Sequence, residues 1–121
     1  MAKIFHVIPF DTWVDNKKSK SKYIEPESLQ NEGFIHCCKA DQLSGVILRF
    51  FSKSLKLYIL RINESKLEND VVYEAPVEAP NSGQLFPHYY GKLPIDSVEK
   101  EFLITRTSIS DAFSIPEHLL T

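Results

Sequence analysis

The spacing of short apolar segments is the feature that most constrains what this chain can fold into. Strand-like runs rich in β-branched and aromatic residues occupy residues 3–8, 34–38, 55–63, 70–75 and 97–106. Helical patterns separate only the first three of these runs, and the later runs follow one another directly. A doubly wound parallel sheet would instead need a helix after each strand. The spacing therefore predicts an α+β fold with a mixed, split sheet and short flanking helices.

Three segments between the early strands carry helix signals. Asp11 is expected to cap a short helix directly after the first strand. Residues 25–33 have Pro26 near their start and Gly33 just past their end, which is typical of a short helix. From Asp41 onwards the apolar residues form one helical stripe, which we expect to pack on the core. This stripe consists of Leu43, Val46, Ile47, Phe50 and Phe51.

The second half of the chain contains two segments shaped by proline. Residues 76–85 hold two prolines, an Asn and a Gly, and they predict a loop. The segment "FPHYYGKLP", residues 86–94, is expected to be irregular or to lie at a sheet edge, because Pro87 and Pro94 cannot donate to a sheet ladder. Residues 116–120 predict a terminal helical turn.

Composition excludes several classes of protein. A length of 121 residues predicts a single domain spanning residues 1–121. The net charge of −2 makes nucleic acid an improbable partner, since a basic face is expected for that role. No apolar run approaches the roughly 18 residues of a membrane span. With no export signal visible, we expect a cytoplasmic monomer whose partner is a small molecule.

Two short segments, "EGFIHCC" at residues 32–38 and "FPHYYG", enclose histidines in apolar surroundings. Strand alternation would place His36 on one face with Phe34 and Cys38, and His6 on one face with its apolar neighbours. A buried imidazole left without a partner costs about 1 to 3 kcal/mol, so any one histidine could simply be a satisfied structural residue. Three of them in or beside predicted sheet elements, at 6, 36 and 88, indicate a shared site.

Three kinds of chemistry could use these residues. A zinc site would combine His6, His36, His88 and Cys38, but the local ligand pairs of structural zinc sites are missing, so we predict no metal. Cys37 or Cys38 could be a nucleophile with a histidine base, although no feature visibly activates either thiol. Ser28 lacks the elbow motif of serine hydrolases.

Glu74 is the carboxylate most suggestive of a role. Strand alternation in "VVYE" places it on the face of Val72, opposite Val71 and Tyr73. If that face lines a cleft, Glu74 could accept hydrogen bonds from ribose hydroxyls or act as a base.

These motifs together resemble a known family. The chain has "FH" near its start, Trp13, Tyr23, "SLQNEGFIHCC", Gln42, "LYILRI", "VVYE" and "FPHYYG". The series resembles the bacterial domain-of-unknown-function family numbered 952, with Cys38 where that family usually has Ser and Tyr73 where it usually has Trp. The family's fold is similar to that of ADP-ribosyltransferases, in which a split sheet forms a nucleotide-binding cleft.

The resemblance implies a cleft lined by His6, His36, Glu74 and His88. It implies catalytic roles for His36, Glu74 and His88 in a transferase, or a degenerate transferase, that acts on a nucleotide-like ligand such as NAD or ADP-ribose. The residues implied to contact the ligand are His6, Ser28, Cys38 and Tyr90. Two alternatives stay open, namely a non-catalytic module that uses the same cleft to sense a small ligand, and histidines that only organise polar contacts within the fold.

Overall fold

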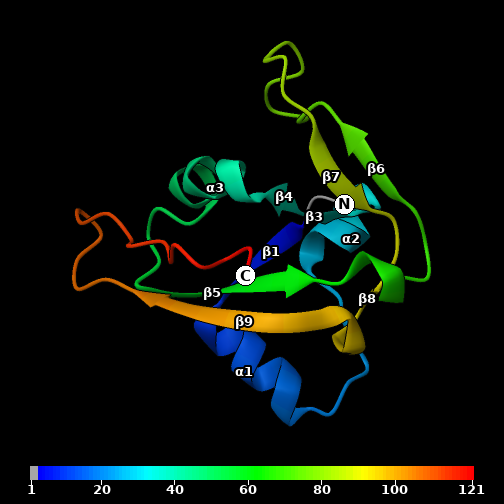
Figure 1. The fold of residues 1–121 in the computed structure, drawn as a ribbon, viewed down its shortest axis with the longest axis horizontal. Helices are drawn as coiled ribbons and strands as arrows, with labels where there is room; N and C mark the ends of the chain where they lie inside the picture. Colours follow the sequence, from blue (N-terminus) through cyan, green and yellow to red (C-terminus); the bar gives the residue numbers. More distant parts are fainter. Residues whose placement is uncertain (1–2) are drawn as a thin grey trace.

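The computed structural model describes residues 3–121, in which strands form three separate sheets (Figure 1). The four-stranded sheet has the order β4-β1-β5-β9, with β1 (Ile4–Pro9), β4 (Cys38–Lys39), β5 (Lys56–Ile62) and β9 (Val98–Thr105). The three-stranded sheet has the order β3-β7-β6, with β3 (Ile35–His36), β6 (Val71–Glu74) and β7 (Phe86–Tyr89). The third sheet pairs β2 (Tyr23–Ile24) with β8 (Leu93–Pro94).

Short helices connect and cover these sheets. The α-helices are α1 (Phe10–Lys18), α2 (Glu27–Glu32) and α3 (Leu43–Phe50). The 3-10 helices are η1 (Ala40–Gln42), η2 (Glu64–Lys66) and η3 (Ile95–Ser97). Figure 1 shows α1 and α3 on opposite sides of β5 and β9. Within residues 3–121, no helix combines the length and the apolar character that crossing a membrane requires.

Side chains of the four-stranded sheet alternate between its two faces, and each face packs into its own hydrophobic core. Ile4 and Ile8 of β1 point to one face, where they pack with Trp13 of α1. Phe5 and Val7 point to the other face. That second face is covered by α3 and by the C-terminal segment, through Leu43, Ile47 and Leu119. Both faces of β1 are thus apolar, as its continuous run of apolar residues predicts.

The α+β class is confirmed, but the expected mixture of strand directions is wrong. Every strand pair formed by residues 3–121 is antiparallel. A parallel pair needs a crossover connection, usually a helix, between its strands. Here β6 and β7 follow one another through the loop between Glu74 and Phe86 and pair as a hairpin, which makes them antiparallel. The loop predicted at residues 76–85 is confirmed.

The segment expected as one strand, residues 34–38, is two short strands in different sheets. Ile35 of β3 pairs with Tyr89 of β7, whereas Cys38 of β4 pairs with Phe5 of β1. The chain therefore passes from one sheet to the other at Cys37. β4 pairs only with Ile4 and Phe5 of β1. From residue 6 onwards, no strand formed by residues 3–121 pairs with that edge of β1.

The segment "FPHYYG" is more regular than expected, because its first four residues form β7, the central strand of its sheet. Pro87 is tolerated there because it lies where β3 ends. The Cys37 nitrogen donates to the Pro87 oxygen at 3.1 Å, so this side of Pro87 faces the break between the sheets. An N–H at position 87 would point to the same side as the Pro87 oxygen. No ladder hydrogen bond is needed there, so proline is tolerated.

The helix boundaries are predicted in part. Gly33 is confirmed as the residue after α2, with a left-handed φ of 86° that favours glycine. Asp11 is not the cap of α1, which begins at Phe10, because the extended Pro9 ends β1 and the helix starts at once. In α3 the stripe is buried at Leu43 and Ile47, but Phe50 is 49% exposed. The terminal residues 117–120 form a turn.

Candidate functional site

A cavity of about 560 Å³ lies against the unpaired edge of β1. His6, Val7, Ile8 and Pro9 of that edge line it, together with the segment at Cys37 where the chain changes sheets. Ligand-binding cavities commonly have volumes of about 300 to 1,000 Å³. The cavity therefore follows from the split between the sheets, because β4 is too short to cover β1.

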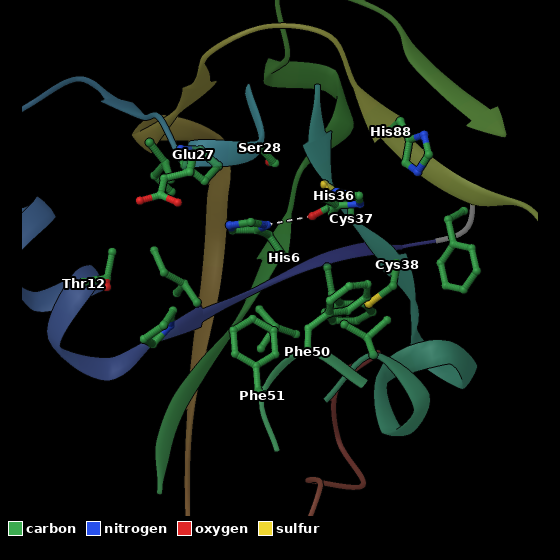
Figure 2. Close-up of a pocket in the computed structure, with 18 of the residues that line it drawn as sticks. His6, Thr12, Glu27, Ser28, His36, Cys37, Cys38, Phe50, Phe51 and His88 are labelled. Atoms are coloured by element: carbon green, nitrogen blue, oxygen red, sulfur yellow. Dashed lines mark hydrogen bonds between the residues drawn. The ribbon is translucent and has the colours of Figure 1, made fainter. Parts of the chain in front are cut away.

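His6 is the most deeply buried polar side chain on this edge, and one of its ring nitrogens is fixed. Its side chain is on β1, and the residue is only 6% exposed. The Nδ1 atom lies 2.8 Å from the backbone oxygen of His36 (Figure 2). A carbonyl oxygen can only accept, so Nδ1 carries the hydrogen and donates. The Nε2 atom then has the lone pair, and Figure 2 shows it on the side of the ring that points away from His36.

The surroundings of His6 keep the ring neutral. Burial is the main cause that lowers the pKa of His6 below its usual value, and the nearby His36 lowers it further. The hydrogen bond to the His36 backbone opposes this shift without cancelling it. A neutral imidazole with hydrogen on Nδ1 has a basic Nε2 at neutral pH. His6 is therefore suited to accept a hydrogen bond or a proton.

His88 lies in a different environment, between an aromatic ring and a carboxylate. Its ring stacks on Phe34, with centroids 4.0 Å apart and planes inclined by 17°. Its Nδ1 atom donates to Oε1 of Glu74 at 2.9 Å, and the Tyr90 hydroxyl donates to the same oxygen at 2.6 Å. These bonds, that of Tyr90 first, lower the pKa of Glu74, and the same carboxylate raises the pKa of Tyr90.

His36 contributes mainly through its backbone. Its side chain is partly exposed, and its Nε2 atom lies 3.1 Å from Oε2 of Glu32. Its ring meets the His88 ring edge to face at 5.5 Å between centroids. The His36 carbonyl belongs to the strand that pairs with β7, yet it is the group that binds His6 of β1. The hydrogen bond between them thus joins the two sheets at the split.

The structure brings most of the predicted site residues to one cavity. His6, His36, His88, Ser28 and Cys38 all line it. Glu74 and Tyr90 lie outside the lining, and Glu74 is connected to it through its hydrogen bond to His88. The predicted group of His36, Glu74 and His88 is connected, but the three residues do not share one open space.

Neither thiol is arranged as a nucleophile. Burial raises the pKa of Cys37 far above its usual value, and it raises the pKa of Cys38 to about 12. Both residues are therefore protonated thiols at neutral pH, whereas a cysteine nucleophile reacts as the thiolate. Within residues 3–121, no group of three or more His, Cys, Asp or Glu side chains is placed to hold a metal ion.

The cavity also has lining residues that sequence reasoning missed. Thr12 of α1 and Glu27 of α2 line it near His6, and Phe50 and Phe51 line it from the end of α3 (Figure 2). Phe50 was expected in the core because it continues the stripe of α3. Its position at the last residue of that helix is the one signal that it could face a cavity instead. Nothing local distinguishes Thr12 or Glu27 from ordinary exposed helix residues.

Comparison with known proteins identifies the family. Residues 8–101 match the family described as "Protein of unknown function (DUF952)", and the chain belongs to it. The fold is similar to the crystal structure of protein CC0527 from Caulobacter crescentus, with a TM-score of 0.77 and 22% identity over 98% of this chain and 99% of that one.

Two further structures of the same protein show the same similarity. A double mutant of CC0527 from Caulobacter crescentus has a TM-score of 0.77 and 21% identity, again over 98% of this chain and 99% of that one. The solution NMR structure of CC0527 has a TM-score of 0.66 and 23% identity over 88% of each chain. At this level of identity the likeness shows the fold alone. No curated protein matches the chain significantly.

Proposed function

We propose that the protein binds a small organic ligand in the cavity and that Nε2 of His6 contacts it. One observation carries this proposal. The His6 ring is almost fully buried and its Nδ1 is fixed by the His36 carbonyl, yet Nε2 makes no hydrogen bond within residues 3–121 and is open to the cavity. An acceptor held rigidly at the wall of a cavity is a suitable contact for a donor group on a ligand.

The same geometry supports a catalytic role. A neutral imidazole can remove a proton from a hydroxyl or amine of a bound molecule. The Nδ1–H bond to the carbonyl then orients the ring and stabilises the charge it gains. In this proposal His6 is the base, and His88, oriented by Glu74, is a second group able to handle a proton. His36 is a positioning residue because its backbone holds His6.

A transferase or degenerate transferase acting on a nucleotide-like ligand is the reaction class we propose. This reaction class rests on the family resemblance. The proposal that the fold is similar to that of ADP-ribosyltransferases rests on the same resemblance. The cavity lining suggests which half of NAD or ADP-ribose would enter. The lining has only one cationic side chain in residues 3–121, Arg49, and it lies 3.8 Å from Glu78. Phosphates would therefore remain outside, with the nucleoside against the aromatic rings.

A non-catalytic ligand sensor is the second candidate, and a specific observation favours it. Glu74 lies outside the lining, and the buried thiols stay protonated, so neither supplies a nucleophile in the cavity. A single basic nitrogen is enough to recognise a ligand without transforming it. That the chain is a single domain, a monomer and cytoplasmic stays a prediction.

Isothermal titration with NAD, ADP-ribose and adenosine at millimolar concentration tests the binding proposal. We expect at least one ligand to bind the wild type and to bind His6→Asn more weakly. The Asn amide can donate to the His36 carbonyl as Nδ1 does, but it places no nitrogen where Nε2 lies. Equal binding to both proteins would overturn the role of His6. Mass spectrometry of the bound ligand after incubation separates a transferase, which changes its ligand, from a sensor.

A further inference from the structure

His6, Thr12 and Glu27 place polar side chains at one end of the cavity, where Ser28 and Asn16 also line it. Two of these side chains, those of His6 and Glu27, present hydrogen-bond acceptors. We call this part the acceptor end. Figure 2 shows Thr12 and Glu27 beyond the side of the His6 ring that carries its free nitrogen. The carboxylate of Glu27 and Nε2 of His6 can only accept, while the Thr12 hydroxyl can do either. A ligand group that meets both acceptors must therefore donate hydrogen bonds.

The charges of the lining also favour a cation. Three carboxylates line the cavity, those of Glu25, Glu27 and Glu78, against the single guanidinium of Arg49. Arg49 lies 3.8 Å from Glu78, and Lys92 lies 3.8 Å from Glu25. Within residues 3–121 Glu27 forms no ion pair, so the unneutralised carboxylate is the one at the acceptor end. This charge attracts a cation and repels a phosphate or carboxylate.

The remainder of the cavity is suited to an apolar or aromatic body. Phe50 and Phe51 line it from the end of α3, and Phe86 lines it from β7. Flat aromatic faces bind aromatic groups by stacking and attract cations by their quadrupole. An aromatic lining next to an acceptor end indicates a ligand with two distinct parts.

The position of Glu27 alone would not indicate a ligand. It lies in the first turn of α2, where a negative charge is favourable for any helix. The independent observation is His6, which is 6% exposed, is anchored through Nδ1 and presents its free nitrogen to the same space. A buried group aimed at this end distinguishes it from an ordinary acidic surface.

We propose that the acceptor end binds the head group of a cationic ligand, an amine, amidine or guanidine, whose apolar or aromatic body lies against the phenylalanine rings. This inference rests on the proposed function, because it uses the same cavity. It goes further by assigning the charge and hydrogen-bonding character of the ligand. It makes Glu27 a residue that determines specificity, together with His6.

Matched probes of opposite charge test the proposal. Benzamidine and phenethylamine carry a cationic donor on an aromatic body, while benzoate and phenyl phosphate carry an anionic acceptor on a similar body. Affinities are measured by isothermal titration and saturation-transfer NMR for the wild type and for Glu27→Gln. Glu68→Gln is the control, because it removes the same charge from an exposed residue that hydrogen-bonds Tyr23 outside the cavity.

We expect the two cationic probes to bind and the two anionic probes not to bind. Glu27→Gln should weaken benzamidine about tenfold, corresponding to about 1.4 kcal/mol, and Glu68→Gln should change it less than twofold. Anionic probes that bind as well as the cationic ones, or benzamidine affinity unchanged by Glu27→Gln, would overturn the proposal. If nucleosides or nucleotides bind in a His6-dependent way and no cationic probe does, this inference falls and the proposed function stands. If no probe of any kind binds, both fall.

Discussion

His6 and His88 are both almost completely buried, and both donate from Nδ1, but their partners differ. The partner of His6 is a neutral backbone carbonyl, while the partner of His88 is the Glu74 carboxylate. His6 lies beside the unpaired edge of β1, and His88 stacks on Phe34 in the middle of the three-stranded sheet. Both residues line the cavity, so the difference lies in what each ring is bound to. The comparison teaches that a carbonyl partner fixes the His6 ring without placing a charge beside it, whereas Glu74 places a carboxylate beside His88.

The largest expected effect concerns the support of His88. Phe34 is 6% exposed and packs against the rings of His88, His36 and Tyr90. Replacing it with Ala removes a large buried side chain, so we expect the free energy of unfolding to fall by about 3 to 5 kcal/mol. Urea unfolding followed by circular dichroism measures this. A loss below about 1 kcal/mol would mean that Phe34 does not support the three-stranded sheet.

A smaller effect is expected at His6, whose structural role is one hydrogen bond. His6→Ala leaves the His36 carbonyl without its partner, which should lower the free energy of unfolding by about 1 to 3 kcal/mol. His6→Asn, which keeps a donor for that carbonyl, should recover most of this loss. The same urea titrations compare the variants. Equal destabilisation by Ala and Asn would show that the bond between the two sheets is not what His6 contributes to stability.

The pH dependence of stability tests whether His6 is neutral in the folded protein. The pKa of His6 in the folded protein lies below its usual 6.5, so the unfolded chain takes up this proton first as pH falls. The free energy of unfolding should therefore decline as pH falls below about 6.5, until His6 is protonated in the folded state too. Unfolding titrations from about pH 7.5 to about pH 5 bracket the usual pKa of histidine. Over this range the free energy of unfolding should decline less steeply for His6→Asn than for the wild type. Identical slopes in both proteins would contradict a neutral, buried His6.

The smallest effect is expected at the carboxylate that binds His88. The hydrogen bond from Tyr90 to Glu74 raises the pKa of Tyr90, so Glu74→Gln should return that pKa towards its ordinary value. Tyr23 and Glu68 form a similar exposed pair, and Glu68→Gln should move only the pKa of Tyr23. Site-resolved NMR titration of the tyrosine rings measures both. If the pKa of Tyr90 is the same in Glu74→Gln as in the wild type, the hydrogen bond from Tyr90 to Glu74 is contradicted.

The local elements of the fold could be predicted because their signals lie within a few residues. Gly33 ends α2, and the prolines of residues 76–85 interrupt the chain between two strands. The break at Cys37 could not be predicted, because "FIHCC" has the continuous apolar character of one strand. Its division depends on which distant strands, β7 and β1, pair with each half.

The candidate site was predictable to a similar extent. Three histidines in apolar segments were expected at one concavity, and the structure places all three in the cavity lining, although their roles stay predictions. The position of Glu74 outside the lining was not predicted. Alternation along β6 shows which face of the strand carries Glu74, but it does not show which residues cover that face. Thr12 and Glu27 reach the cavity only through the packing of α1 and α2.

The protonation of the His6 ring is the most direct test of the account. Long-range nitrogen–proton correlation NMR on ¹⁵N-labelled protein at neutral pH reports which imidazole nitrogen carries hydrogen. We predict a neutral His6 with hydrogen on Nδ1 and a bare Nε2. A ring protonated at both nitrogens, or one with its hydrogen on Nε2, would contradict the hydrogen bond to His36 and leave the cavity without its basic nitrogen.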